Sequence, residues 1–390
     1  MTDHLCDVVI SVDSHLGESR DFVSRLPKAY RDRFPLFDYN ANGERWPKGC
    51  DRPSEKDMAL EFRSDAKLGT DIERRLRDMA RDGTDAEVIF PNQGLACSLG
   101  TEPGEYYQAW SHAYNDYAWE VFSGHRERFK VAALLAVDDI DATLSEARQR
   151  IEQGFCTLFL PTTVPWQPYR LALYDPLWRL AQETGVSVNF HTFSGNLGNR
   201  ADIASVGELD PARYEKARQL LRDEWEAGPQ LLTYVLGALA GMAPIVELIG
   251  AGVLDRFPAL KFVVTESEAG WLPWVLQFMD QIQTRCHLLV PKLELKPSEY
   301  FRRQGTAAIM DDSIALDHIE RIGADNLMWG NDYPHDEGTF LQSSEPIAQI
   351  RRRLSATDAH KVLSANAAAL YGFDLDYLAA QRTEVTRHLP

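Results

Sequence analysis

The first apolar run of the sequence ends in side chains that can bind a metal ion. Val8–Val12 is rich in β-branched residues and has the length of a strand, and Asp13, His15 and Glu18 follow it. Side chains two residues apart on a strand point to the same face, so Asp13 and His15 can reach one ion. Glu18, just beyond, can turn back to the same place. The alternative for this stretch alone is an aspartate that caps a turn and a histidine that is merely exposed.

Three later apolar runs end in residues of the same kind. His191, Glu266 and Asp332 each close a run of strand length, and His335 follows across a turn that contains proline. Ordinary hydrogen bonding explains one buried carboxylate, whereas several carboxylates and imidazoles at one edge are costly to bring together without a cation. Carboxylates mixed with imidazoles suit iron or manganese. The predicted metal ligands are Asp13, His15, Glu18, His191, Glu266, Asp332 and His335.

Eight strand candidates alternate with helices along the chain and position these residues. Each connection has about the length that parallel strands need for a crossover. The alternation predicts an α/β fold, a (β/α)8 TIM barrel, in which catalytic groups lie at the carboxyl ends of the strands. After the first run, the predicted strands are Ala86–Phe90, Val131–Val137, Cys156–Leu160, Val186–His191, Lys261–Glu266, Gly305–Met310 and Leu327–Asp332.

Two helices indicate what packs against the barrel. Glu105–Arg128 is predicted to bury its many aromatic side chains in the core rather than to form a ligand site with them. Ile72–Arg81 is predicted to be amphipathic and to turn an apolar side inward. That side comprises Ile72, Leu76, Met79 and Ala80.

Two long segments interrupt the alternation. Residues 18–68, rich in proline, arginine and aromatic residues, are predicted to form a lid over the strand ends, because loops of this length in a compact domain are usually functional. Residues 192–250 are predicted to be a helical insertion after the fifth strand, with helices at Asp210–Trp225 and Leu231–Ile249. Both segments belong to a single predicted domain, residues 1–390.

Composition narrows the choice of partners and location. The formal net charge of −17 disfavours nucleic acid or an anionic membrane. The sequence has no apolar run of membrane-spanning length, and its polar N-terminus does not resemble a signal peptide, so a cytoplasmic location is predicted. The 5 cysteines form no CxxC pair, which argues against a disulfide framework or a thiolate zinc site. Without a GxGxxG motif, a bound flavin or nicotinamide is not indicated.

The strand ends carry longer motifs that resemble a known family. Motifs similar to those of the amidohydrolase superfamily occur at Val12–Asp13–Ser14–His15, at Phe190–His191, at Glu266–Ser267–Glu268–Ala269–Gly270–Trp271 and at Gly330–Asn331–Asp332–Tyr333–Pro334–His335. Within this superfamily the chain resembles the branch of the aminocarboxymuconate-semialdehyde and resorcylate decarboxylases. The resemblance covers most of the chain and implies a barrel with metal ligands at Asp13, His15, His191 and Asp332.

The sequence departs from that branch at three places. The usual first-strand pair of histidines has become Asp13-x-His15. The histidine that often serves as acid–base catalyst after the sixth strand has no counterpart, because Gly241–Met242–Ala243–Pro244 lies there. The lysine that binuclear hydrolases carry after the fourth strand is replaced by Leu160–Pro161–Thr162–Thr163. What remains is a set rich in carboxylates, which can hold two ions.

This subgroup pattern resembles the amidohydrolase-fold non-heme dinuclear-iron monooxygenases of antibiotic natural-product biosynthesis. The resemblance implies two iron ions, O2, an external electron donor and hydroxylation of an unactivated C–H bond in a terpenoid coenzyme A thioester. Asp332 or Glu266 would bridge the ions, and these two carboxylates are the predicted catalytic residues. Aromatic side chains near the strand ends, Trp274 among them, would line the substrate cavity.

Two other readings stay open. One is a mononuclear zinc or manganese decarboxylase or hydrolase of an aromatic carboxylic acid, in which Asp332 or Glu266 moves a proton. The other is a non-catalytic subunit whose barrel binds metal only to stabilise a partner. The resemblance also implies a homodimer. Metal identity and count discriminate among the three classes.

Overall fold

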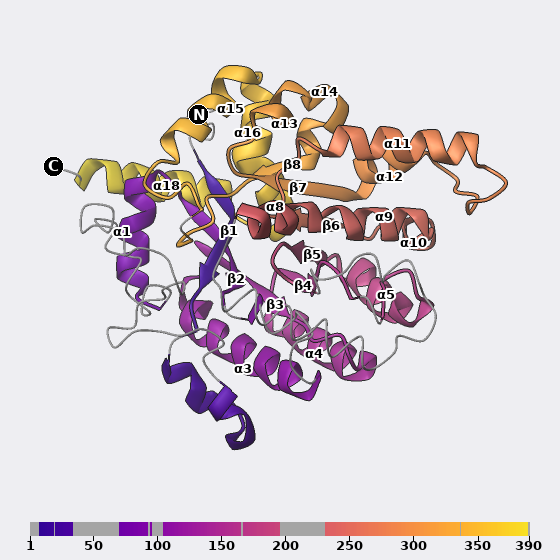
Figure 1. The fold of residues 1–390 in the computed structure, drawn as a ribbon. Helices are drawn as coiled ribbons and strands as arrows, with labels where there is room; N and C mark the ends of the chain where they lie inside the picture. Colours follow the sequence, from indigo (N-terminus) through magenta and orange to yellow (C-terminus); the bar gives the residue numbers. More distant parts are fainter. Residues whose placement is uncertain are drawn as a thin grey trace.

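The strands form the centre of the molecule. The computed structural model describes residues 8–18, 20–33, 70–92, 94–95, 104–164, 167–195, 231–335 and 337–388. Eight parallel strands pair in chain order, from β1 to β8, and helices surround them (Figure 1), which confirms the predicted (β/α)8 barrel. The strands are β1 Ile10–Leu16, β2 Ala86–Pro91, β3 Phe129–Leu134, β4 Thr157–Pro161, β5 Ser187–His191, β6 Phe262–Thr265, β7 Gly305–Ile309 and β8 Leu327–Trp329.

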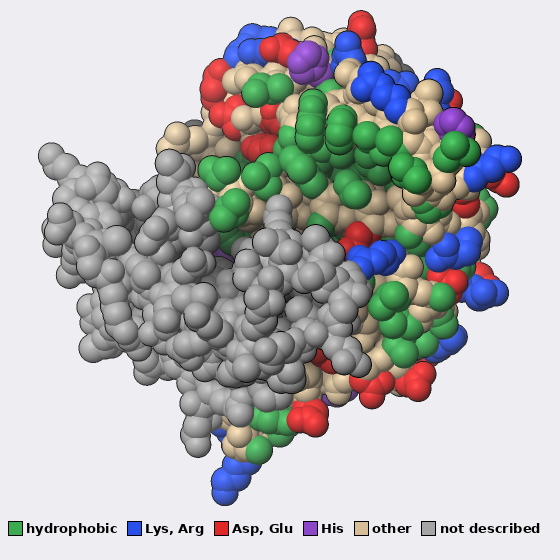
Figure 2. All heavy atoms as spheres, turned by 45° about the vertical axis from the view of Figure 1, so that its right-hand side comes forward, with side chains coloured by type: hydrophobic (Ala, Val, Ile, Leu, Met, Phe, Trp, Pro, Cys, Tyr) green, Lys and Arg blue, Asp and Glu red, His purple; other side chains and the backbone are tan. Residues whose placement is uncertain are grey.

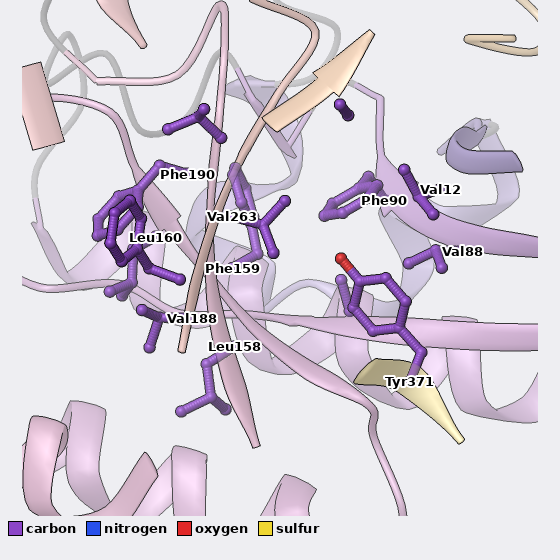
Figure 3. Close-up of a cluster of buried hydrophobic side chains, with 14 of the residues drawn as sticks. Val12, Val88, Phe90, Leu158, Phe159, Leu160, Val188, Phe190, Val263 and Tyr371 are labelled. Atoms are coloured by element: carbon purple, nitrogen blue, oxygen red, sulfur yellow. The ribbon is translucent and has the colours of Figure 1, made fainter. Parts of the chain in front are cut away.

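Burial explains why the strands are apolar runs rather than alternating ones. Helices cover the outside and side chains fill the inside, so both faces of each strand need apolar residues. Val88, Phe159 and Val263 are fully buried, and Figure 3 shows them in the barrel core together with Tyr371, which lies near Phe90. The metal-capable side chains lie at one end of this packed core, so they rest on a rigid base.

The helices begin and end at recognisable signals. Helix α1 starts after Asp71, whose carboxylate accepts a hydrogen bond from the backbone N–H of Arg74, and it ends at Gly83 in the left-handed conformation. The other α-helices are α3 Gly104–Phe122, α4 Ile140–Gln153, α5 Asp175–Thr184, α8 Leu231–Ala240, α9 Met242–Gly250, α10 Val253–Arg256, α11 Leu272–Arg285, α12 Pro297–Gln304, α13 Ser313–Asp317, α14 Ile319–Ile322, α15 Ser344–Arg353, α16 Ala356–His360, α17 Asn366–Tyr371 and α18 Leu375–His388.

Strand β1 carries Asp13 and His15, as predicted, whereas two helices differ from the prediction. The helical stretch predicted over Leu231–Ile249 is divided at Gly241, where any side chain would collide with Ser267. In helix α1, Ile72–Asp82, the predicted apolar residues Ile72 and Leu76 pack only partly buried against the core, and the buried residues are Arg75, Asp78, Met79 and Asp82.

The two insertions lie mostly beyond the described residues. Short 3-10 helices at Arg20–Arg25 and Lys28–Arg33 begin the first one. Residues 34–68 of the predicted lid and the predicted helix Asp210–Trp225 fall outside the described ranges. Among the described helices, none has the length and apolar character required to cross a bilayer.

Candidate metal centre

Six of the seven predicted ligands converge at the carboxyl ends of the strands. Strand β1 supplies Asp13 and His15, strand β5 ends with His191, and the segments that follow β6 and β8 supply the other three. Two overlapping groups of four have ligand atoms that all lie within 4.8 Å of one another. The groups are Asp13, His15, His191 and Glu266, and His15, Glu266, Asp332 and His335.

Backbone carbonyls orient two of the histidines. The Nδ1 of His15 lies 2.8 Å from the carbonyl oxygen of Pro91, and the Nδ1 of His191 lies 3.0 Å from that of Thr192. Because a carbonyl can only accept a hydrogen bond, the proton of each neutral ring is on Nδ1, which leaves the lone pair of Nε2 facing the cluster. This is the tautomer that a metal ligand needs.

The inward nitrogens face carboxylate oxygens at short distances. The Nε2 of His15 lies 3.0 Å from the Oδ1 of Asp332, and the Nε2 of His191 lies 3.1 Å from the Oδ1 of Asp13. The Nδ1 of His335 lies 2.8 Å from the same Oδ1 of Asp332. Lone pairs that face carboxylates repel each other unless a proton or a cation lies between them.

Burial and mutual charge shift the pKa values of the cluster. Burial would lower the pKa of His15, but the carboxylates of Asp13 and Asp332 beside its Nε2 raise that pKa to about 10. Burial alone would also raise the pKa of Asp13, yet the charges and hydrogen bonds of His191 and His15 hold it below its ordinary value. For Glu266, burial and then the negative charges of Asp332 and Asp13 raise the pKa well above its ordinary value.

The donor atoms fit a divalent cation. The Nε2 of His15, the Oε2 of Glu266 and both carboxylate oxygens of Asp332 are buried and form no hydrogen bond. Buried polar atoms in proteins nearly always have a partner, so their accumulation at one point indicates a missing one. Carboxylate oxygens together with imidazole nitrogens are suitable ligands for manganese or zinc.

Two of the carboxylates lie on unusual backbone. Glu266 has a φ of 55° and Asp332 a φ of 56°, in the left-handed region that residues other than glycine rarely adopt. Glu266 follows β6 and Asp332 follows β8. At both positions the backbone turns away from the barrel, while the carboxylate remains above the strand ends. Such conformations are frequent at functional sites and persist only where the surrounding structure holds them.

Glu18 does not join the cluster. Its buried carboxylate accepts hydrogen bonds from the backbone N–H of Asn92 at 3.2 Å and of Gly94 at 2.8 Å, and from the indole N–H of Trp110 at 3.3 Å. Its predicted role as a metal ligand therefore has no support in this geometry. Instead, Glu18 fixes the loop after β2, and the side chain of Asn92 in that loop lies 3.2 Å from the Nε2 of His335.

The groups that support the ligands could not be identified from the sequence. Pro91 and Thr192 act through backbone oxygens, which every residue possesses, so their side-chain identities carry no signal.

Trp274, a predicted cavity wall, lies on α11 with 63% of its surface exposed, and it stacks on Phe278 at a centroid distance of 5.5 Å.

Comparisons with known proteins identify a family and a curated relative. A sequence profile of an amidohydrolase family matches residues 23–373. The chain is 23% identical over 277 residues to a gamma-resorcylate decarboxylase from Polaromonas sp. (strain JS666 / ATCC BAA-500), which covers 68% of this chain and 77% of the relative.

Solved structures with the same fold include further decarboxylases. The 5-carboxyvanillate decarboxylase from Sphingomonas paucimobilis has a TM-score of 0.67 and 18% identity, over 94% of this chain and 100% of the other. A dihydroxybenzoic acid decarboxylase from Polaromonas sp. JS666, solved with bound manganese and the inhibitor 2-nitroresorcinol, has a TM-score of 0.62 and 18% identity, over 94% and 97%.

These relatives overturn the prediction of a dinuclear-iron monooxygenase. The named proteins are decarboxylases of aromatic acids, and manganese is bound in the solved dihydroxybenzoic acid decarboxylase. The predicted pair of iron ions, the O2, the electron donor and the coenzyme A thioester have no counterpart among them. The error came from counting surplus carboxylates, one of which, Glu18, binds backbone amides instead.

Proposed function

Because the chain belongs to the amidohydrolase family, we propose that it is a metal-dependent decarboxylase of an aromatic carboxylic acid. The observation that carries this proposal is the buried donor cluster at the strand ends, with imidazole nitrogens turned inward and carboxylate oxygens left without hydrogen bonds. The named relatives support the substrate class, since they act on hydroxylated or methoxylated benzoic acids.

Four residues are proposed to hold the cation. Asp13, His15, His191 and Asp332 supply two carboxylates and two imidazoles, a set that suits one manganese or zinc ion. The Nε2 of His15 lies 3.5 Å from Asp13 and 3.0 Å from Asp332, and the Nε2 of His191 lies 3.1 Å from Asp13. Bound there, the ion would polarise the carboxylate or a neighbouring phenolic oxygen of the substrate as a Lewis acid. The position of the cluster on rigid strand ends keeps its geometry constant while substrate enters.

Glu266 is proposed to donate the proton that takes the place of CO2 on the aromatic ring. In decarboxylation the bond from the ring to the carboxylate carbon breaks, CO2 leaves, and a proton takes its place on the ring carbon. A buried carboxyl whose pKa is raised retains such a proton more readily, and burial raises the pKa of Glu266 well above its ordinary value. It lies within the cluster, with its Oε2 3.5 Å from the Nε2 of His191.

The direct test is CO2 release by metal-loaded protein. We expect protein loaded with Mn2+ to bind about one ion per chain and to release CO2 from at least one member of a panel of hydroxybenzoic and methoxybenzoic acids. Replacing His191 with Ala should lower Mn2+ affinity by more than about 100-fold, because a ligand is lost rather than a supporting partner. His112→Ala is the matched control, since His112 is exposed and pairs with Glu146 far from the cluster. Full metal occupancy in His191→Ala, or no CO2 from any acid at full occupancy of the wild type, would contradict the proposal.

A further inference from the structure

The inward side of α1 is charged where a barrel helix is normally apolar. Arg75, Asp78 and Asp82 lie at positions i, i+3 and i+7, so they share one face of the helix. Their exposed fractions are 0%, 8% and 5%. Charged side chains are rarely buried unless they have specific partners, so the contacts of this face should explain its composition.

Arg75 binds the end of β1. Its Nη1 donates to the carbonyl oxygen of His15 at 2.8 Å, and its Nη2 donates to the Oγ of Ser14 at 2.5 Å. Its Nε donates to the Oε2 of Glu87 on β2 at 2.6 Å, which compensates its charge. The guanidinium also lies 4.8 Å from the centre of the Tyr333 ring. One side chain of α1 thus contacts the β1 strand end and the segment after β8.

The two aspartates bind the residues on either side of Asp332. The hydroxyl of Tyr333 donates to the Oδ2 of Asp78 at 3.1 Å. The side-chain amide of Asn331 donates to the Oδ2 of Asp82 at 3.0 Å, and the hydroxyl of Ser343 donates to the same oxygen at 2.6 Å. Asp332 therefore lies between two neighbours that are both held by one helix.

The barrel closes at this point without a regular β-ladder. Between β1 and β8, one isolated bridge, from Ser14 to Tyr333, replaces the ladder that joins the other neighbouring strands of the described structure. Two backbone hydrogen bonds between described residues cross this seam, from the N–H of Asp332 to the carbonyl of Asp13 at 3.0 Å and from the N–H of His15 to the carbonyl of Tyr333 at 2.6 Å. The hydroxyls of Ser11 and Ser14 add hydrogen bonds to the side chain of Asn331 at 2.9 Å and to the carbonyl of Tyr333 at 3.2 Å. The backbone of Asp332 is in the left-handed region, which aspartate adopts less readily than glycine, so the contacts of α1 add support where the chain is strained.

We propose that the charged face of α1 is a positioning device for the metal site, which holds Asp332 over the barrel by fixing Asn331 and Tyr333. The inference rests on the proposed role of Asp332 as a metal ligand. Asp78 and Asp82 are positioning residues, since neither touches the cluster.

The test compares two positioning variants with a matched control. Asp82→Asn removes the charge that accepts from Asn331 and Ser343, and Tyr333→Phe removes only the hydroxyl that binds Asp78, so the second variant should fold even if the first is unstable. Asp85→Asn is the control: Asp85 is equally buried but accepts from the backbone N–H of Val9, at the opposite end of the barrel. In full-length protein, Mn2+ affinity should fall about 10- to 100-fold in both positioning variants and remain unchanged in the control.

Hydrogen exchange of metal-free protein separates the two proposals. The amides of residues 327–335 should exchange faster in Asp82→Asn and Tyr333→Phe than in Asp85→Asn, whether or not the wild type binds Mn2+. Faster exchange together with a wild type that binds no Mn2+ would support the anchoring role and overturn the metal-dependent function. If both positioning variants bind Mn2+ as tightly as the wild type and their amides exchange at the wild-type rate, the positioning role is overturned, and the metal-dependent function is not.

Discussion

At the scale of single residues, Glu266 is the carboxylate of the cluster whose replacement should lower activity while the metal stays bound. With the cation held by Asp13, His15, His191 and Asp332 as proposed, Glu266 is available for proton transfer. Glu266→Gln keeps the shape and removes the transferable proton, and we expect kcat to fall by about 100- to 10,000-fold while about one Mn2+ per chain stays bound. Metal analysis and CO2 release on the same sample provide the measurement. Loss of the metal together with activity would show instead that Glu266 is a ligand.

The pKa shifts predict how the metal-free protein responds to pH. The folded protein binds more protons than the unfolded chain wherever a folded pKa is raised, so stability falls as pH rises through that window. His15 causes this loss of stability between pH 6.5 and about pH 10, the range between its ordinary and its raised pKa. The raised pKa of Glu266 acts in the same direction. We expect the Tm of metal-free protein to fall between pH 6.5 and pH 9. Mn2+ should stabilise the protein more at the higher pH, because the ion replaces protons. A Tm that rises over this range in metal-free protein would contradict the pKa assignment.

The types and positions of the metal-capable residues could be recognised in the sequence. Prediction failed where backbone N–H and carbonyl groups determine what a side chain binds. Asp13, His191 and Asp332 were recognisable because a polar residue at the end of a buried apolar run is unusual. Glu18 met the same criterion and was misassigned, because the amides of Asn92 and Gly94 that it binds come from a distant loop. Spacing in the sequence cannot distinguish a carboxylate that binds a cation from one that binds N–H groups.

At the scale of secondary-structure elements, the ion pair between α1 and β2 determines how α1 packs. Arg75 and Glu87 are both fully buried, and their closest atoms are 2.6 Å apart. Removing one member leaves an uncompensated buried charge, so Arg75→Leu should lower the free energy of unfolding by about 3–5 kcal/mol. The double variant Arg75→Leu/Glu87→Leu should recover part of that loss. Urea unfolding of the three proteins measures the coupling, and equal losses in the single and double variants would contradict it.

The same helix marks the limit of prediction from sequence. The strands could be predicted because burial on both faces requires continuous apolar runs, and the aromatic residues of α3, such as Trp110 and Tyr114, are buried as expected. In α1 the apolar positions Ile72 and Leu76 are only partly buried, whereas charged positions face the barrel. Charged side chains on a helix normally mark the side that faces solvent. In α1 the charged side chains face inward, because they bind partners on β1, β2 and the loop after β8.

At the scale of the whole molecule, helix α11 and the loop after it expose large apolar side chains. Trp274 is 63% exposed, Phe278 46%, Leu288 85% and Leu289 87%. Figure 2, turned toward the side of α11 and α12, shows hydrophobic side chains gathered on this face. Among the exposed residues between 271 and 292 there is no aspartate or glutamate, although the chain has 58 of them. Two chains with a net charge of −17 repel each other least at such a surface.

We propose that a second copy of the chain covers this face and that the protein is a homodimer. The four side chains expose roughly 500 Å² of apolar surface, more than half of the ~800 Å² that each partner buries in a standard interface. Trp274→Glu combined with Leu289→Glu should give a monomer with an unchanged circular dichroism spectrum, because both side chains point into solvent within one chain. Sedimentation equilibrium of the wild type and the variant measures this, with Tyr377→Glu, an exposed residue on α18 on the other side of the molecule (Figure 1), as the control. A monomeric wild type would refute the dimer, and a dimeric double variant would place the interface on another face.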